Sequence, residues 1–404
     1  MNAELIAIGS ELVCGAGLDT NSQWLSQELE ARGWTVTRHT TIADDLDAMV
    51  ETLQLAARRC RIVLVTGGLG PTRDDITREA MSGAFNQPLV EDETELQYIT
   101  GMFARLGRPM PDRNRIQAMR PRDATPLRNN HGTAPGVLLN VASPKCMIAA
   151  MPGVPGEMKK MFDEQLVAML PKSSVFVRRV VLRTFGYGES HAEELLGNLT
   201  ERGRNPEVGI TASGAVISLS VTARADTELQ CDTLIQPVIN LINDKLSHAV
   251  YGTGSDELHL VVRRSLADRN LTVALAEGTT TGGLLSQWLV HDCADEGPVV
   301  RSDRLISGTE NLDDLVQLCK TVQNDADYAI VTSHSVYRRN DDGFAVMHGQ
   351  FAVTGPGLSR VVNVDFTGDL GIFRERAARM AINLIRLHIN GHAVEPVVSG
   401  NTVR

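Results

Sequence analysis

The stretch VTGGLGPTRDDITREA, from Val65 to Ala80, constrains the fold more than any other part of this sequence. It continues a nearly unbroken apolar segment that begins at residue 61, which is typical of a parallel strand buried on both faces of a sheet. The residues that follow have the composition of a helix. A structural turn would need fewer glycines, which cost backbone entropy, and would not need adjacent aspartates. The stretch therefore indicates a parallel α/β sheet with a site at one edge.

The same alternation of strands and helices extends over residues 1–170. Short strands are predicted at 4–9 and 35–42, and between them Thr20 and Asn21 can cap a helix that ends at Gly33. Alternating strands and helices predict a parallel-sheet α/β fold, and we assign residues 1–170 to this first domain.

Two further domains are predicted after residue 175. Residues 175–250 alternate short strands and helices in the manner of a small α+β domain. The Gly-rich segment 251–257 is interpreted as a hinge, and residues 256–394 form a third domain of mixed α/β pattern.

The composition excludes several classes of function. The net charge of −10 disfavours nucleic acid and anionic membranes as partners, since generic binding to either needs Lys and Arg. The six cysteines are widely spaced without a CxxC pair, which is typical of a reducing compartment. The first residues lack a basic segment, and no apolar stretch is long enough to span a bilayer. A cytoplasmic protein without a membrane partner is expected.

Glycines and acids follow two predicted strands where each strand ends. Gly68 and Gly70 let the backbone approach a ligand, and the helix after them offers free N–H groups to a phosphate. Asp74 and Asp75 beside a phosphate require a divalent cation between them, since hard cations prefer carboxylate oxygens. Glu11 lies in the loop after the first strand, at the same edge. These residues predict a shared metal site.

Each motif also has a purely structural interpretation. Thr72 and Asp75 fit a helix capping box, which explains the threonine and one aspartate but not GGLGP. Asn21 can belong to a helix cap, and Glu157, after the rigid PGVPG turn, can be an ordinary helix start. Thr133 lies in another Gly-containing loop, NNHGTAPGV. No Walker-type phosphate loop, dinucleotide fingerprint or Ser-His-Asp pattern is visible.

Four ordered motifs resemble the CinA family. They are GSELVCG at 9–15, TGGLGPTRDDIT at 66–77, GTAPG at 132–136 and PGVPGEMK at 152–159. The first domain is also similar to the molybdopterin-binding fold, whose related turn G-G-x-G…R-D-x-T ends here at Asp75 and Thr77. The resemblance implies a three-layer α/β domain that dimerises. It implies a metal-dependent pyrophosphatase acting on ADP-ribose.

The resemblance extends to the other two domains, with one departure. FGYGES at 185–190 matches the start of the family's KH-type domain, although the G-x-x-G clamp for RNA is absent. The third domain is similar to a nicotinamide-mononucleotide deamidase whose A-E-S-C-T-G-G turn supplies a serine nucleophile. This chain has AEGTTTGG at 276–283, which places Thr279 at the serine position, and segment 297–315 lacks the family's tyrosine and lysine. A catalytically degraded deamidase-like domain is expected, although a ligand-binding role without turnover stays open.

The resulting hypothesis is metal-dependent hydrolysis of ADP-ribose to AMP and ribose 5-phosphate by a homodimer. Mg²⁺, Mn²⁺ or Co²⁺ would be held by Glu11, Asp74 and Asp75, which are also the candidate catalytic residues. The expected substrate contacts are Gly68, Gly70, Thr72, Thr133, Asn21 and Glu157. Alternatives are a module that binds a nucleotide or molybdopterin without cleaving it, and a residual deamidase. A DNA-uptake scaffold has little support from the charge.

Overall fold

The structure is a computed structural model that describes residues 2–171, 173–291, 299–306, 314–339 and 345–393. The chain forms two compact units. The first comprises residues 1–177 with 224–228, and the second comprises residues 178–223 with 229–404. No helix in these described ranges is long and apolar enough to cross a membrane.

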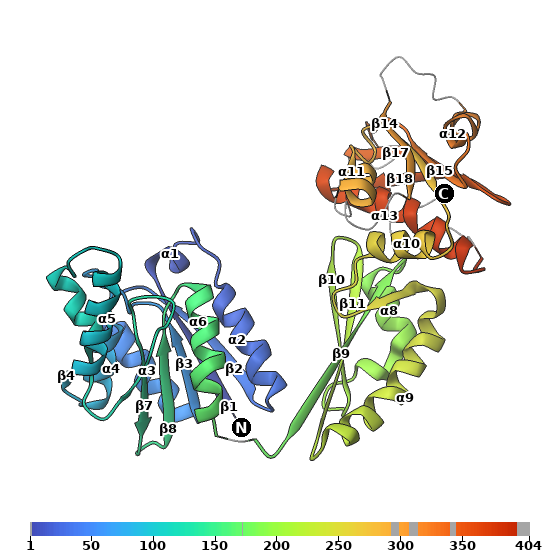
Figure 1. The fold of residues 1–404 in the computed structure, drawn as a ribbon. Helices are drawn as coiled ribbons and strands as arrows, with labels where there is room; N and C mark the ends of the chain where they lie inside the picture. The colour runs from blue at the N-terminus through green and yellow to red at the C-terminus, as the bar shows by residue number, and fades with distance from the viewer. Residues whose placement is uncertain (1, 172, 292–298, 307–313, 340–344, 394–404) are drawn as a thin grey trace. The chain divides into compact units, whose positions relative to one another are not determined.

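The first unit is built on a six-stranded sheet in the order β2-β1-β3-β8-β7-β6 (Figure 1). The four strands β2, β1, β3 and β8 are parallel, as the sequence predicts. The strands are β1 Asn2–Ile8, β2 Thr35–Ile42, β3 Ile62–Thr66, β6 Thr125–Leu127, β7 Gly136–Val141 and β8 Cys146–Met151. A separate pair is formed by β4 Leu89–Glu91 and β5 Met119–Pro121.

Strands β7 and β6 run antiparallel to their neighbours, so the sheet is mixed and not wholly parallel. Only four residues join β7 to β8. A parallel pairing would need a crossover of a dozen or more residues, whereas a short connection permits only a hairpin. The parallel-sheet prediction therefore holds for the strands that carry the glycine-rich turns, and the antiparallel hairpin extends the sheet at one edge.

Helices cover both faces of this sheet, which confirms the predicted three layers. Val63 and Val65 of β3 pack into the core beneath α3 and α4, while Ile62 and Leu64 pack into the core beneath α2 and α6. This alternation is the strand period of two, applied to a strand buried on both faces. The helices are α1 Ser10–Val13, α2 Thr20–Ala31, α3 Leu46–Arg59, α4 Thr77–Phe85, α5 Glu93–Arg105, α6 Pro155–Met161 and α7 Val167–Met169, with a 3₁₀ helix at Asp112–Ala118 and a π-helical turn at Phe162–Leu166.

The second unit begins with a four-stranded sheet in the order β10-β11-β9-β12, in which the β10–β11 and β9–β12 pairs are antiparallel. The Gly-rich segment interpreted as a hinge starts inside this sheet, because β12 pairs with β9. The elements are β9 Phe176–Phe185, β10 Glu207–Ser213, β11 Val216–Ala225 and β12 Val250–Thr253, with helices α8 Glu189–Leu196 and α9 Glu228–Leu246 and 3₁₀ turns at Gly197–Thr200 and Ser247–Ala249.

The rest of the second unit is a mixed sheet in the order β14-β13-β15-β17-β16, with β18 also paired to β17. Residues of β13 alternate between a core with α10 and α13 and a core with α12. The elements are α10 Leu258–Ala267, β13 Val273–Glu277, α11 Leu284–Ser286, a π-helical turn at Gln287–His291, β14 Val300–Leu305, α12 Leu315–Gln323, β15 Tyr328–Thr332, β16 Val336–Arg339, β17 Ala345–Gly355, β18 Leu358–Phe366 and α13 Leu370–Ile389.

One hydrophobic core joins both parts of the second unit. Phe185, Val216 and Tyr251 from the four-stranded sheet belong to the same buried cluster as residues of α10 and α13. Two arginines of α13 add hydrogen bonds between these parts: Arg379 Nη1 donates to the Gly214 carbonyl at 2.7 Å, and Arg386 Nη2 donates to the His248 carbonyl at 2.6 Å. Shared apolar burial and these hydrogen bonds hold the two parts together.

His248 makes the stability of the second unit depend on pH. Burial, the neighbouring His392 and the Arg386 guanidinium lower the pKa of His248 below 6.5. The unfolded chain then binds a proton at His248 more readily than the folded chain does. The contribution of neutral His248 to the stability of the fold is therefore complete above about pH 6.5 and is lost as the pH falls through the pKa of the folded state. We expect the melting temperature to fall between pH 7.5 and about pH 5 more in the wild type than in a His248→Gln variant, measured by calorimetry. Equal falls would contradict this.

Candidate functional site

A cavity of about 430 Å³ lies at the carboxyl ends of the parallel strands of the first unit. All four parallel strands contribute the loop that follows them, which is where open α/β sheets bind ligands. The lining residues are Ile8 at the end of β1 with Gly9 and Glu11 after it, Asp44 after β2, Gly67, Gly68, Leu69, Gly70, Pro71, Asp74 and Asp75 after β3, Pro152, Gly153, Val154 and Glu157 after β8, Gln117 from the 3₁₀ helix, and Thr133 and Ala134 from the loop before β7.

The structure brings most of the predicted site residues together around this cavity. Glu11, Asp74, Asp75, Gly68, Gly70, Thr133 and Glu157 all line it. Asn21 lines a second cavity of about 250 Å³, which shares Ile8, Glu11 and Gly153 with the first. Thr72 is outside both linings and contacts Asp75 instead.

The β3 turn depends on glycine at its start. Gly67 has φ of +100°, and a Cβ there would lie 2.2 Å from the Ile8 carbonyl oxygen. Both the left-handed conformation and the close approach exclude a larger side chain without rearrangement. Thr77 then closes the turn, since its Oγ1 donates to the Gly67 carbonyl at 2.9 Å and its amide donates to Gly68 at 3.1 Å. The GG pair thus fixes where the cavity-lining backbone lies.

Thr72 holds the adjacent aspartates. Its backbone N–H donates to Asp75 Oδ2 at 2.8 Å, and its hydroxyl donates to the same oxygen. This hydroxyl also lies close to Asp74, whose pKa it lowers together with the Asp74 backbone amide. Helix α4 begins at Thr77 without a side-chain cap, so Thr72 and Asp75 do not form the predicted capping box. Their contact lies in the turn before the helix. It coexists with the position of Asp75 on the cavity wall, so the contact orients a site residue.

Glu157 is held on the cavity wall by a hydrogen bond from a buried asparagine. Asn129 Nδ2 donates to Glu157 Oε2 at 2.6 Å and to the Ala134 carbonyl at 3.1 Å, while its Oδ1 accepts from the His131 amide at 3.0 Å. The Glu157 carboxyl lies directly against Gly132, where a Cβ would collide with it. These contacts join the loop that carries Thr133 to helix α6, and the first glycine of GTAPG, Gly132, permits the close approach.

Arg78 lies fully buried beneath the glycine-rich turn, with 1% of its surface exposed. Its Nη1 donates to the Leu69 carbonyl at 3.0 Å and its Nη2 donates to the Pro135 carbonyl at 3.2 Å. Burial lowers its pKa to about 10, which leaves it protonated at neutral pH. Arg78 therefore joins two loops of the cavity wall through charge-assisted hydrogen bonds.

Four residues in or around the site were not predicted from the sequence, namely Asp44, Gln117, Arg78 and Asn129. Asp44 could have been found, because it follows β2 as Glu11 follows β1, and its Oδ2 accepts from both the amide and hydroxyl of Ser10 at 2.9 Å. Nothing in the local sequence marks Arg78, since an arginine in an amphipathic helix usually faces solvent. Asn129 begins the NNHGTAPGV loop, but nothing in that loop marks it as the partner of Glu157, which it reaches through tertiary packing. Gln117 carries no local signal.

The acidic residues of the cavity do not form a cluster of three ligands. Across the described parts of the chain, no group of three or more His, Cys, Asp or Glu side chains is close enough to hold a metal ion. The carboxylate oxygens of these residues are nevertheless the kind of ligand that a hard divalent cation prefers. Mg²⁺ keeps several water ligands and commonly binds one or two protein carboxylates, so it needs no cluster of three.

The AEGTTTGG turn of the second unit lies between β13 and α11. Thr279 Oγ1 accepts from the Ser335 amide at 2.8 Å and lies 3.1 Å from the Ser335 hydroxyl, while His334 Nδ1 accepts from the Thr279 amide. The His334 ring is therefore engaged with the backbone and not with the Thr279 hydroxyl. Segment 297–315, where the family's tyrosine and lysine are absent, lies partly outside the described residues.

Comparison with known proteins agrees with this arrangement. A family described as a probable molybdopterin binding domain matches residues 4–172, and one described as the damage-inducible protein CinA KH domain matches residues 179–252. The fold therefore comprises a molybdopterin-binding-type domain, a KH-type domain and a further α/β region, as the sequence predicts. A crystal structure of CinA from Thermoplasma acidophilum is 30% identical, covers 42% of this chain and 98% of its own, and has a TM-score of 0.39.

Curated relatives match up to 95% of the chain. A relative in Clostridium novyi, named for competence-damage induction, is 38% identical over 292 residues, which are 72% of this chain and 70% of the relative. A CinA-like protein from Deinococcus radiodurans is 34% identical over 394 residues, which are 95% of this chain and 96% of the relative. The chain therefore belongs to the CinA family.

Proposed function

We propose that the cavity of the first unit hydrolyses the diphosphate of ADP-ribose to AMP and ribose 5-phosphate with a divalent metal ion. The single observation that carries the proposal is the charge of its wall. Five acidic side chains line the cavity, namely Glu11, Asp44, Asp74, Asp75 and Glu157, and its described lining contains no Lys or Arg. A diphosphate can approach such a wall only if a cation lies between them.

The family resemblance supplies the substrate in this proposal, and the cavity supports it. Gly68, Gly70 and Thr133 all line this cavity, so the glycine backbone and the Thr133 hydroxyl are the candidate contacts for phosphate oxygens. The smaller cavity beside Asn21 leaves room for the nucleoside or ribose end of an elongated substrate. Glu11 bridges the two cavities, so it is positioned at the junction where the diphosphate would lie.

Glu11, Asp74 and Asp75 are the residues that would hold the ion, directly or through water. A bound Mg²⁺, Mn²⁺ or Co²⁺ would supply charge neutralisation and a water of lowered pKa. The protein's own part is to place carboxylates near the attacking water, where one of them can act as general base. Thr72 orients Asp75 for this role through its two hydrogen bonds. We include a homodimer and a cytoplasmic location in the proposal.

A binding module is the second candidate. The same glycine-rich loops could hold a nucleotide or a molybdopterin phosphate without cleaving it, since one matched family is described as a probable molybdopterin binding domain. Phosphate sites without a metal usually recruit Lys or Arg. The buried Arg78 does not line the cavity, and its described contacts are with loop carbonyls, so we favour the hydrolase.

The decisive experiment is release of AMP from ADP-ribose by the purified full chain. We expect turnover with Mg²⁺, Mn²⁺ or Co²⁺ and loss of turnover with EDTA, because the acid-lined cavity cannot hold a bare diphosphate. AMP can be measured by chromatography over time. Absence of AMP with all three metals, combined with binding of the nucleotide in calorimetry, would favour the binding module.

Ammonia release from nicotinamide mononucleotide should be followed in the same samples. We expect none, because the Thr279 hydroxyl contacts Ser335 and the His334 ring contacts the backbone, so neither forms a nucleophile–base pair in the described structure. Ammonia release would contradict this and would assign a residual deamidase activity to the second unit.

A further inference from the structure

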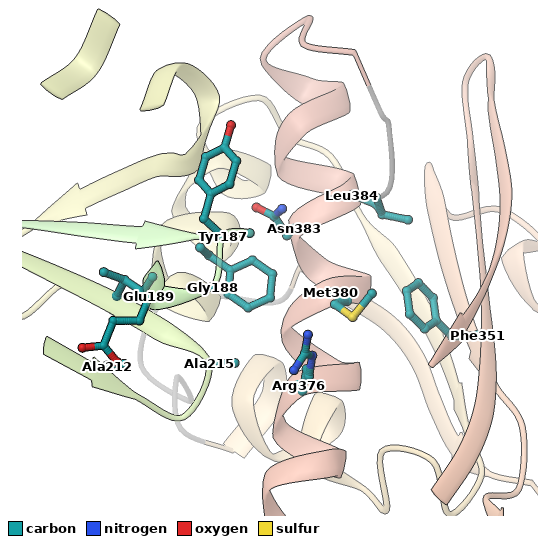
Figure 2. Close-up of a pocket in the computed structure, with 13 residues that line it drawn as sticks. Tyr187, Gly188, Glu189, Ala212, Ala215, Phe351, Arg376, Met380, Asn383 and Leu384 are labelled. Carbon is teal, nitrogen blue, oxygen red and sulfur yellow. The ribbon is translucent and has the colours of Figure 1, made fainter. Parts of the chain in front are cut away.

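A third cavity, of about 130 Å³, lies within the second unit, between helix α13 and the KH-type sheet (Figure 2). Arg376, Met380, Asn383 and Leu384 line it from α13. Their spacing of i, i+4, i+7 and i+8 places them on one helix face. The other walls are Phe185, Gly186, Tyr187, Gly188, Glu189, Ala212, Ala215 and Ile217 from the KH-type part and Phe351 from β17.

Arg376 presents a cation without an acceptor at one end of this cavity. The other arginines of α13 donate to carbonyls: Arg379 and Arg386 to the KH-type part and Arg374 to Thr279. Among the described residues, Arg376 makes no hydrogen bond or ion pair, and its one recorded contact is with the Phe366 ring at 5.8 Å. Partial burial lowers its pKa. A partly desolvated guanidinium gains strongly from an anionic partner.

Asn383 presents a second donor two turns further along the helix. Its side chain is 97% buried, at 3% exposure, and its Oδ1 accepts from Arg386 Nε at 2.8 Å. An arginine can only donate, so the amide orientation is fixed and the Nδ2 hydrogens are the free end. No acceptor for them occurs among the described residues. Asn383 is therefore a buried residue on the cavity wall whose Nδ2 group can donate to a molecule in the cavity.

The space between these two donors is apolar and small. Met380 lies one turn from Arg376, and aromatic and aliphatic side chains form most of the remaining wall. An apolar cavity of ~150 Å³ holds one benzene, so this volume fits a single six-membered ring. Arg376 and Asn383 are seven residues apart, or about 10 Å along the helix axis, so one carboxylate cannot bridge both.

We propose that this cavity binds a small aromatic carboxylic acid that carries a hydroxyl or carbonyl group at the opposite end of its ring. The carboxylate would pair with Arg376, the ring would lie against Met380 and Phe185, and the far oxygen would accept from Asn383 Nδ2. Glu189, the one acid on the wall, does not oppose this, because its carboxylate points away from α13 (Figure 2). The proposal does not depend on the chemistry of the first unit.

The test is calorimetric titration of the full chain with 4-hydroxybenzoate, 4-hydroxybenzamide and benzoate. We expect 4-hydroxybenzoate to bind with a dissociation constant between about 0.05 and 1 mM. The amide, which lacks the charge, should bind at least about tenfold more weakly. Benzoate, which lacks the far oxygen, should bind more weakly than 4-hydroxybenzoate, but by a smaller factor than the amide.

Two matched variants locate the site. Arg376→Gln should weaken 4-hydroxybenzoate by about tenfold or more and abolish the preference for the acid over the amide. Arg374→Gln is the control, because Arg374 lies two residues earlier on the same helix and donates to the Thr279 carbonyl instead. The Arg374→Gln variant should bind 4-hydroxybenzoate with the affinity of the wild type. Absence of binding at millimolar 4-hydroxybenzoate, equal affinity for acid and amide in the wild type, or unchanged affinity in Arg376→Gln would each overturn the proposal.

Discussion

Asp75→Asn is expected to lower metal-dependent release of AMP from ADP-ribose by at least about a hundredfold. The asparagine keeps the size of the side chain and an oxygen that can accept from Thr72, so the turn should stay folded. What it removes is the charge that would attract the metal or accept a proton from water. Initial rates across a range of metal concentrations measure the effect, and melting curves check the fold.

Asp123→Asn is the control for this variant, since Asp123 is an exposed aspartate of the same unit that lies outside the cavity lining. It should retain full activity. Recovery of Asp75→Asn at high metal concentration would indicate that Asp75 holds the ion. Activity equal to the wild type at every metal concentration would remove Asp75 from the mechanism.

Arg78→Met is expected to lower the free energy of unfolding of the first unit by about 2–4 kcal/mol. Methionine fills a similar unbranched volume, but the Leu69 and Pro135 carbonyls lose their charged donor. Burying the Arg78 charge costs free energy, as its lowered pKa shows, and the variant no longer bears that cost. The expected loss of unfolding free energy is therefore limited to the upper value given. Because Leu69 lines the cavity, AMP release should fall as well.

Urea unfolding followed by tryptophan fluorescence measures this loss in a Trp288→Phe background. The two remaining tryptophans, Trp24 and Trp34, both belong to the core beneath α2 and α6, so they report on the first unit alone. Arg73→Met is the matched control, because Arg73 is exposed and lies five residues earlier. If both variants unfold at the same urea concentration, Arg78 contributes no net stability.

Much of the first unit could be predicted because its signals are local. The apolar segment at β3, the alternation of strands with helices and the glycine pair after β3 each depend on residues close together in the chain. Ligands of open α/β sheets bind at the carboxyl ends of the strands, so residues just after those ends were predicted to lie together. Glu11, Asp74, Asp75 and Gly68 do line one cavity. The antiparallel hairpin of β7 and β8 was missed, although its short connection was visible in the sequence.

By itself the sequence determined the secondary structure around the site, the edge of the sheet on which it lies and the acidic character of its wall. Only the tertiary structure decided that Arg78 points inward to Pro135, 57 residues away, and that Asn129 holds Glu157 across 28 residues. It alone placed Arg376 and Asn383 around a cavity opposite the KH-type sheet. The physical reason is that backbone preference is set by neighbours along the chain, whereas a side chain's partners are set by which elements pack against its own.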